Sequence, residues 1–233
     1  MHPQLKPVPE AILNTLKILG IGPGHVTELR ILNVRDHHNS QFSYTLGGYF
    51  DNPEELVKAA LSVNHALGWY IMLNPCHPDL LSRLYNRAVK LAKGESTQDW
   101  EILRRVWLPV DTDPVRIPRI SSTEEEHQLA INRAHEIAAH LSSRGWPDPI
   151  VGDSGNGGHL LYPIDLPIND GGLVQDCLKY LDQRFSDDRV KVDTSVSNPA
   201  RIWKLYGTPA CKGDSTENRP HRMANLLEIP NGL

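Results

Sequence analysis

Near the middle of the sequence an apolar run leads into two aspartates, in the segment Val106-Trp107-Leu108-Pro109-Val110-Asp111-Thr112-Asp113-Pro114. The apolar part, Val106–Val110, predicts a short strand that ends on the aspartates. Side chains of a strand alternate between faces, so the carboxylates of Asp111 and Asp113 project from the same face. Two close carboxylates repel each other, and a divalent cation relieves the repulsion. The pair is therefore a candidate metal site, and a solvated turn is the alternative.

A glycine-rich segment farther along the chain reads Ser154-Gly155-Asn156-Gly157-Gly158-His159. The strands expected on its two sides are Pro149–Val151 and His159–Ile164. We predict a hairpin with the segment at its tip. Glycines such as Gly157 let backbone N–H groups approach phosphate oxygens, and the side chains of Ser154 and His159 add donors. The segment is a candidate phosphate-binding element, and the alternative is an ordinary glycine turn with a solvated histidine.

A third carboxylate, Asp193, lies in the apolar segment Arg189–Val196, which we predict to be a strand. An aspartate within a strand is unfavourable unless it is exposed at an edge or has a partner, and a shared metal ion would explain it. Another strand is expected over residues 201–206. From there a neighbouring strand would aim polar side chains at the same site, namely Asn198, Arg201 and Lys204.

Helical and extended patterns alternate along the rest of the chain, which indicates a mixed α/β (α+β) fold. Capping residues and acids typical of helix starts occur at Asp51–Glu55 and Ser122–Glu126. Further helices are expected over residues 79–93 and 173–185, and further strands over residues 28–34 and 69–73. We find no internal repeat. We expect a single domain, residues 1–233, with an N-terminal α/β subdomain (residues 1–95) packed on a second subdomain (residues 96–233).

The bulk composition is that of an ordinary globular protein, with 39% hydrophobic and 22% charged residues among 233. No apolar run reaches the roughly 18–20 residues that cross a bilayer, and no secretory signal begins the sequence, so we expect a cytoplasmic protein without membrane partners. The three cysteines lie far apart, which excludes a four-cysteine zinc site. The net charge of −4 argues against nucleic-acid binding over the whole surface, but residues 199–222 carry five basic and two acidic side chains, which is enough for a local phosphate-binding patch.

The order of the three chemical elements resembles motifs I, II and III of the archaeo-eukaryotic primase superfamily. These elements are an Asp-x-Asp pair, a glycine-rich Ser-to-His segment and an aspartate on a strand. The segments 108–116, 154–162 and 198–208 are similar to segments of bacterial, phage and plasmid primase-polymerases, and residues 212–222 resemble the end of their catalytic core. The resemblance spans residues 106–222, which is roughly half of the chain.

The resemblance implies a catalytic core with an RNA-recognition-motif-like fold, joined to the N-terminal unit. It assigns catalysis and the binding of two Mg²⁺ or Mn²⁺ ions to Asp111, Asp113 and Asp193. It assigns contacts with nucleotide phosphates to four further residues, Ser154, His159, Arg201 and Lys204. Gly157 and Asn198 complete the candidate nucleotide-binding set.

The implied partners are template DNA, a primer strand, NTPs or dNTPs, and helicase or accessory primase domains outside this sequence. Many replicative primases carry a zinc-binding module, and this sequence has no candidate for one, so templated extension is expected ahead of primer initiation.

The leading hypothesis is a DNA primase or polymerase that transfers nucleotides from (d)NTPs to a 3′-hydroxyl on a template. One alternative is a non-catalytic nucleic-acid-binding module of a replication initiator, although such a module has no need for Asp111, Asp113, His159 and Asp193 together. Another is a metal-dependent phosphoesterase that uses the same carboxylates or the segment Asp36-His37-His38.

Overall fold

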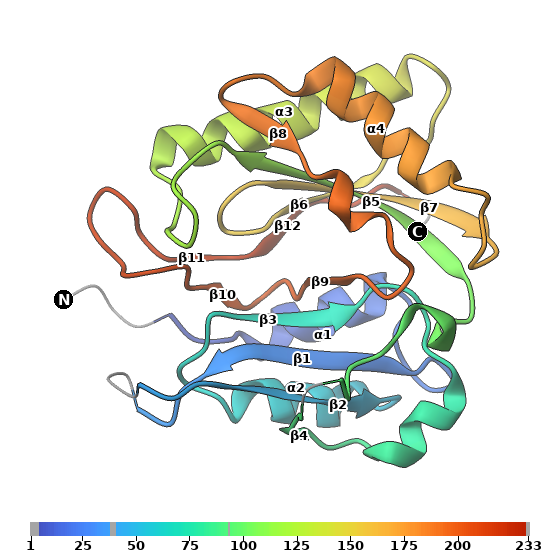
Figure 1. Ribbon diagram of the computed structural model, residues 1–233, viewed down its shortest axis with the longest axis vertical. Helices are drawn as coiled ribbons and strands as arrows, with labels where there is room; N and C mark the ends of the chain where they lie inside the picture. Colours follow the sequence, from blue (N-terminus) through green and yellow to red (C-terminus); the bar gives the residue numbers. More distant parts are fainter. Residues whose placement is uncertain (1–4, 38–40, 93, 232–233) are drawn as a thin grey trace.

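The computed structural model describes residues 5–37, 41–92 and 94–231. The backbone forms two sheets with antiparallel strand pairing, shown one above the other in Figure 1. The upper sheet has the strand order β12-β6-β7-β5-β8. The lower sheet has the order β11-β10-β3-β1-β2-β4, and β9 also pairs with β3. The strands β9 and β10 lie on the side of the lower sheet that faces the upper one (Figure 1).

The upper sheet contains the succession strand, helix, strand, strand, helix, strand. These elements are β5 (Arg105–Pro114), α3 (Glu124–Ser142), β6 (Ile150–Asp153), β7 (Gly158–Leu166), α4 (Leu173–Phe185) and β8 (Val190–Val192). The first strand, β5, is central between β7 and β8, which is the RNA-recognition-motif-like arrangement that the family resemblance implied. Both helices cover the outer face of the sheet (Figure 1). The inner face is left to meet the lower sheet.

The lower sheet combines elements from both ends of the chain. Its N-terminal strands are β1 (Thr27–Val34), β2 (Tyr44–Phe50), β3 (Gly68–Met72) and β4 (Val89–Lys90). Its C-terminal strands are β9 (Ile202–Lys204), β10 (Pro209–Ala210) and β11 (Arg222–Met223). The chain then returns to the upper sheet as β12 (Asn225–Glu228), which pairs with β6. Membership of the two sheets therefore does not follow the division expected at residue 95.

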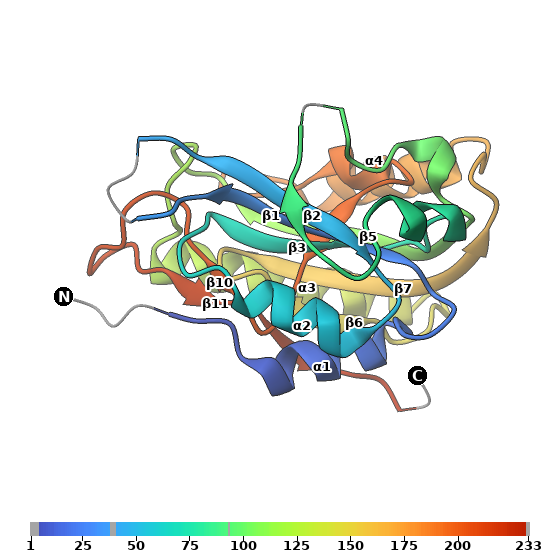
Figure 2. The same cartoon turned by 90° about the horizontal axis from the view of Figure 1, so that it is seen from below.

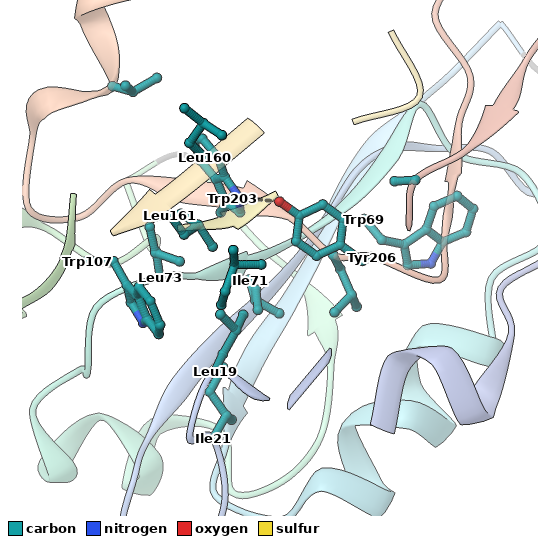
Figure 3. Close-up of a cluster of buried hydrophobic side chains, with 14 of the residues drawn as sticks. Leu19, Ile21, Trp69, Ile71, Leu73, Trp107, Leu160, Leu161, Trp203 and Tyr206 are labelled. Atoms are coloured by element: carbon teal, nitrogen blue, oxygen red, sulfur yellow. Dashed lines mark hydrogen bonds between the residues drawn. The ribbon is translucent and has the colours of Figure 1, made fainter. Parts of the chain in front are cut away.

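Helices α1 (Pro9–Ile18) and α2 (Pro53–Leu61) pack on each other, and α2 contacts β1 and β2 (Figure 2). One hydrophobic core runs through both sheets. Figure 3 shows part of this core, which includes Trp69, Trp203 and Tyr206 from the lower sheet and the segment after β9, together with Leu160 and Leu161 of β7. Because the two parts share this core, they hold their inner faces in a fixed relation.

The helix starts expected from the sequence are confirmed. The Asn52 side chain accepts hydrogen bonds from the backbone N–H groups of Glu54 and Glu55 at the start of α2. Thr123 and Glu126 form a reciprocal capping box at the start of α3. No helix in the described part of the chain is long and apolar enough to span a membrane.

The prediction of a helix over residues 79–93 is wrong: residues 79–92 do not form one continuous helix, and residue 93 lies outside the described residues. The segment contains a short 3₁₀ helix, η1 (Pro78–Arg83), followed by β4. A second 3₁₀ helix, η2 (Asp99–Glu101), precedes β5. Asn86 accounts for the interruption, because it has a positive φ of 49° and its Oδ1 accepts from the backbone N–H groups of Asp51 and Asn52. This long-range contact overrides the local helical pattern.

Candidate active site

The central strand β5 carries Asp111 and Asp113 on the inner face of the upper sheet. Thr112, between them, donates from Oγ1 to the carbonyl oxygen of Ala130 in α3 at 2.8 Å, so Thr112 faces the helices. The two aspartates therefore face the lower sheet. The sequence placed both aspartates at the end of a strand, and β5 includes them and continues to Pro114, with Asp111 paired to His159 and Asp113 paired to Lys191.

Asp193 lies beside Asp111. Its backbone N–H donates to the carbonyl oxygen of Asp111 at 2.9 Å. The expected strand through Val196 is too long, because β8 ends at Val192 and a 3₁₀ helix, η3 (Thr194–Ser197), follows. The Asp193 side chain caps this helix, with Oδ1 accepting from the N–H of Ser195 at 2.8 Å. Asp193 therefore occupies a cap position next to the central strand.

A pocket of about 250 Å³ between the two sheets collects most of the predicted residues. Those that line it are Asp111, Asp113, Asp193, Ser154, His159, Arg201 and Lys204. Two residues of the predicted set, Gly157 and Asn198, are not part of its lining. The acidic side chains come from the upper sheet and its edge, whereas Arg201 and Lys204 come from the lower sheet and the residue before β9. The pocket therefore has an acidic wall and a basic wall.

The carboxyl group of Asp111 is in an unfavourable environment for an isolated anion. Burial, followed by the nearby charges of Asp113 and Asp193, raises its pKa well above the ordinary value. Its Oδ1 atom is buried and has no hydrogen-bond partner among the described residues. A buried carboxylate oxygen without a partner is costly, and hard oxygen ligands of this kind suit Mg²⁺ or Mn²⁺. The residues present therefore fit a divalent cation.

The carboxylates of Asp111, Asp113 and Asp193 do not converge on a single metal-binding position in this structure. No three His, Cys, Asp or Glu side chains within residues 5–37, 41–92 and 94–231 form a ready metal-binding cluster. Asp113 Oδ1 lies 3.4 Å from Nη1 of Arg116, and Asp193 Oδ2 lies 3.6 Å from Nη2 of Arg201. A divalent ion at Asp111 would compete with these two arginines for the other carboxylates.

His159 is buried under the aromatic side chains of the opposite wall. Its ring lies on that of Trp203, with centroids 4.0 Å apart, and its Nδ1 is 3.0 Å from the hydroxyl oxygen of Tyr206. Its Nε2 lies 3.6 Å from Oδ1 of Asp111. Burial lowers the pKa of His159 to about 3, so the ring is neutral at physiological pH. His159 is therefore a neutral hydrogen-bonding group rather than a cation.

The hydrogen bonds of the glycine-rich turn are largely satisfied internally. Ser154 Oγ accepts from the backbone N–H groups of Asn156 and Gly157, and it donates to the carbonyl oxygen of Gly157. A Cβ atom at Gly157 would lie 2.2 Å from the carbonyl oxygen of Thr112. Close packing against β5 thus explains this glycine, and its N–H is already engaged within the turn.

Lys204 reaches the pocket from β9 in the lower sheet, and Arg201 from the residue just before β9, rather than from a strand next to β8. Arg201 donates from Nη2 to Oγ of Ser195 at 2.8 Å. Lys204 is buried and donates from Nζ to Oγ1 of Thr208 and to the carbonyl oxygen of Pro209. Burial lowers the pKa of Lys204 to about 7.

Asn198 serves the turn that precedes Arg201. Its Nδ2 donates to Oδ1 of Asp99 at 3.2 Å, and the same carboxylate oxygen accepts from the N–H of Ala200. The side chain therefore fixes the backbone next to the pocket.

Comparisons with known proteins give no match to a family model and none to a curated protein. Among solved structures, the chain is similar to the AEP domain of the primase-polymerase of cyanophage S-2L, with a TM-score of 0.55 over 99% of this chain and 94% of that one, at 14% sequence identity. The chain has the fold of a primase-polymerase AEP domain. A weaker similarity, to primase RepB′, has a TM-score of 0.47 and 13% identity over 94% of this chain and 56% of that one.

Two ionisable residues that line the pocket of this AEP fold, Lys212 and Tyr70, were not among the predicted site residues. Lys212 lines the pocket, and its charge lowers the pKa of Asp111 against the larger upward effects. The excess of basic residues in the segment 199–222 was the available signal for it. Tyr70 of β3 also lines the pocket, and burial together with Asp111 and Asp113 raises its pKa to about 12. It lies in an ordinary apolar strand, and nothing in its sequence context marked it.

The Asp36-His37-His38 segment is separate from this pocket. Asp36 and His37 are exposed, Asp36 accepts a hydrogen bond from the hydroxyl of Tyr44, and neither residue lines the pocket. His38 lies outside the described residues.

Proposed function

We propose that this chain is the catalytic core of a DNA primase-polymerase that transfers nucleotides from NTPs or dNTPs to a 3′-hydroxyl on a DNA template. One observation carries the proposal. Asp111 holds a buried carboxylate oxygen without a partner at the floor of the pocket, next to Asp113 and Asp193, and basic side chains form the opposite wall. A pocket that binds both a divalent cation and a triphosphate needs this separation of charge.

Asp111, Asp113 and Asp193 would hold the Mg²⁺ or Mn²⁺ ions. When bound, such ions lower the pKa of an attacking hydroxyl and neutralise charge that builds up on the phosphates and the leaving oxygen. Binding at Asp113 and Asp193 would release Arg116 and Arg201 from their carboxylate partners. Arg201 would then be free to pair with a phosphate on the same side of the pocket.

The triphosphate would lie against the basic side chains of Arg201, Lys204 and Lys212, all of which line the pocket. His159 would contribute a neutral N–H. Ser154 and Gly157 would act by holding the turn beside β5, and Asn198 by holding the turn before Arg201. Template DNA and a primer strand are the implied macromolecular substrates, and helicase or accessory primase domains are the implied partners.

The test is primer extension with purified protein, a primed template, labelled dNTPs and Mn²⁺. The proposal expects extension by the wild type, loss of extension in Asp111→Asn and full activity in Asp188→Asn, which changes an exposed aspartate outside the pocket. Template binding without extension would favour a non-catalytic module. Release of phosphate or nucleoside monophosphate without extension would favour a phosphoesterase.

A further inference from the structure

A short chain of hydrogen bonds leads from the buried core to the pocket. The indole Nε1 of Trp203 donates to the hydroxyl oxygen of Tyr206 at 3.0 Å, a contact marked in Figure 3. The same oxygen is 3.0 Å from Nδ1 of His159. Tyr206 and Trp203 are nearly inaccessible to solvent, so water does not supply alternative partners for these groups.

The chemistry of these groups fixes the direction of the bonds. An indole N–H is only a donor, so the oxygen of Tyr206 accepts from Trp203. The hydroxyl hydrogen of Tyr206 must then find an acceptor, and among the described residues His159 is the other partner of this hydroxyl. If Nδ1 carried the hydrogen of the neutral ring, the hydroxyl hydrogen would be buried without a partner, which is unfavourable. The favoured arrangement has Tyr206 donating to a bare Nδ1.

The other side of the ring leads to the same assignment. Nε2 of His159 faces Oδ1 of Asp111 at 3.6 Å, and this oxygen has no hydrogen-bond partner among the described residues. A bare nitrogen facing a carboxylate oxygen would place two lone pairs against each other. An N–H at Nε2 gives an attractive contact, and at 3.6 Å it is too long to be a hydrogen bond, so this donor remains available.

We propose that Tyr206 is a positioning residue: held by Trp203, it fixes His159 in the tautomer with hydrogen on Nε2 and directs that N–H to the Asp111 side of the pocket, where it donates to a phosphate oxygen of the bound nucleotide. The role of the N–H in nucleotide binding rests on the proposed function, whereas the tautomer does not.

The sequence makes room for this arrangement at a specific position. A Cβ atom at Gly152 of β6 would lie 2.4 Å from the hydroxyl oxygen of Tyr206. The backbone φ of Gly152 is not positive, so backbone conformation does not require a glycine there. The glycine is needed because it leaves space for the Tyr206 hydroxyl. The close contact between the tilted rings of Trp203 and His159, with centroids 4.0 Å apart, restricts the orientation of the His159 ring.

The tautomer can be measured directly by ¹⁵N NMR of the ligand-free protein with labelled histidine. His159 is assigned by the resonance that is lost in His159→Ala. We expect the spectrum of a neutral ring with hydrogen on Nε2 in the wild type, and a mixture of tautomers in Tyr206→Phe, which keeps the ring and removes the hydroxyl. A wild-type ring with hydrogen on Nδ1 overturns the proposal, and this result does not depend on how Tyr206→Phe folds.

Tyr162→Phe is the matched control. Tyr162 is also fully buried and lies on β7 with His159, but on the opposite face, where its ring packs against Trp146 and its hydroxyl has no partner among the described residues. Removing that hydroxyl should leave the tautomer of His159 unchanged. A tautomer change in Tyr162→Phe as large as that in Tyr206→Phe would point to general loosening of the fold and would overturn the assignment to Tyr206.

Nucleotide incorporation completes the test. Tyr206→Phe should raise KM for the nucleotide roughly 2- to 10-fold, as expected when a neutral hydrogen bond is weakened, and should leave kcat within about twofold. A fall in kcat with unchanged KM contradicts the role in nucleotide binding. If the wild type has the expected tautomer and incorporates no nucleotide, the proposed function has failed and the positioning by Tyr206 stands.

Discussion

Asp111→Asn should make the metal-free protein more stable while removing its response to metal. Asparagine has nearly the same shape as aspartate and carries no charge. The substitution puts a neutral amide atom in place of the buried carboxylate oxygen that has no partner, and it removes the charge repulsion from Asp113 and Asp193. A buried unpaired charged group costs at least about 1–3 kcal/mol, and for a chain of this length each kcal/mol changes Tm by roughly 2–4 °C. We therefore expect Tm to rise by roughly 2–12 °C in the presence of a chelator.

The effect should depend on pH in a defined direction. The pKa of Asp111 is raised in the folded protein above its ordinary value of 3.8. The folded state therefore binds this proton more tightly, and the cost of the charge is absent below the unfolded pKa and complete above the raised folded pKa. The advantage of Asp111→Asn should thus be small near pH 4 and grow as the pH rises towards neutrality.

Adding Mn²⁺ should change Tm in the opposite sense, by stabilising the wild type more than Asp111→Asn. Mn²⁺ at about 100 times its Kd should stabilise the wild type by about 2.7 kcal/mol, which corresponds to a rise in Tm of roughly 5–11 °C. In Asp111→Asn this rise should be largely lost. The assay is differential scanning fluorimetry with and without Mn²⁺, and Asp188→Asn, at an exposed position, is the control. A variant that is less stable than the wild type without metal, or that keeps the full Mn²⁺ response, would refute the reasoning and favour a structural role for Asp111.

Three further substitutions separate the roles of neighbouring groups. His159→Ala should raise the nucleotide KM only roughly 2- to 13-fold, as for the loss of a neutral hydrogen bond, and should keep the Mn²⁺-induced rise in Tm; loss of the Mn²⁺ response in this variant would make His159 a ligand. Lys204→Met should be more stable than the wild type, by the largest margin at pH 6. The pKa of Lys204 is about 7 in the folded protein against an ordinary value of 10.5, so the charged form destabilises the fold at low pH. In denaturant titrations, the difference in the free energy of unfolding between the variant and the wild type should narrow as the pH rises above 7. Gly157→Ala should cost about 1–3 kcal/mol in the same titrations, because its Cβ would meet the backbone of Thr112 at 2.2 Å, whereas Gly22→Ala, in open space, should not.

The elements that sequence reasoning predicted well are those with strong local signals. The capping box Thr123–Glu126, the periodic helix after it and the helix at 173–185 depend on neighbours in the chain, and the structure has them. The hairpin with the glycine-rich tip also depends on local turn chemistry. Alternation along β5 placed Asp111 and Asp113 on one face, and that inference holds even though the strand is longer than expected.

The parts that the sequence did not reveal depend on contacts between distant segments. Strand β9 pairs with β3, and this pairing buries Trp203, and Tyr206 just after the strand, in the core shared by both sheets. Burial also makes His159 neutral, which no local pattern indicates. Lys212 reaches the pocket because the chain after β10 passes its rim, and a count of basic residues could not place a single side chain there.

The most direct test of the central claim is a crystal structure with Mn²⁺ and a non-hydrolysable dNTP, in which anomalous scattering locates the ions. We expect a Mn²⁺ peak at about 2.0–2.6 Å from carboxylate oxygens of Asp111 and Asp113, with Asp193 contributing to the same site and the triphosphate lying against Arg201. Mn²⁺ and nucleotide bound elsewhere, with Oδ1 of Asp111 still without a partner, would contradict it.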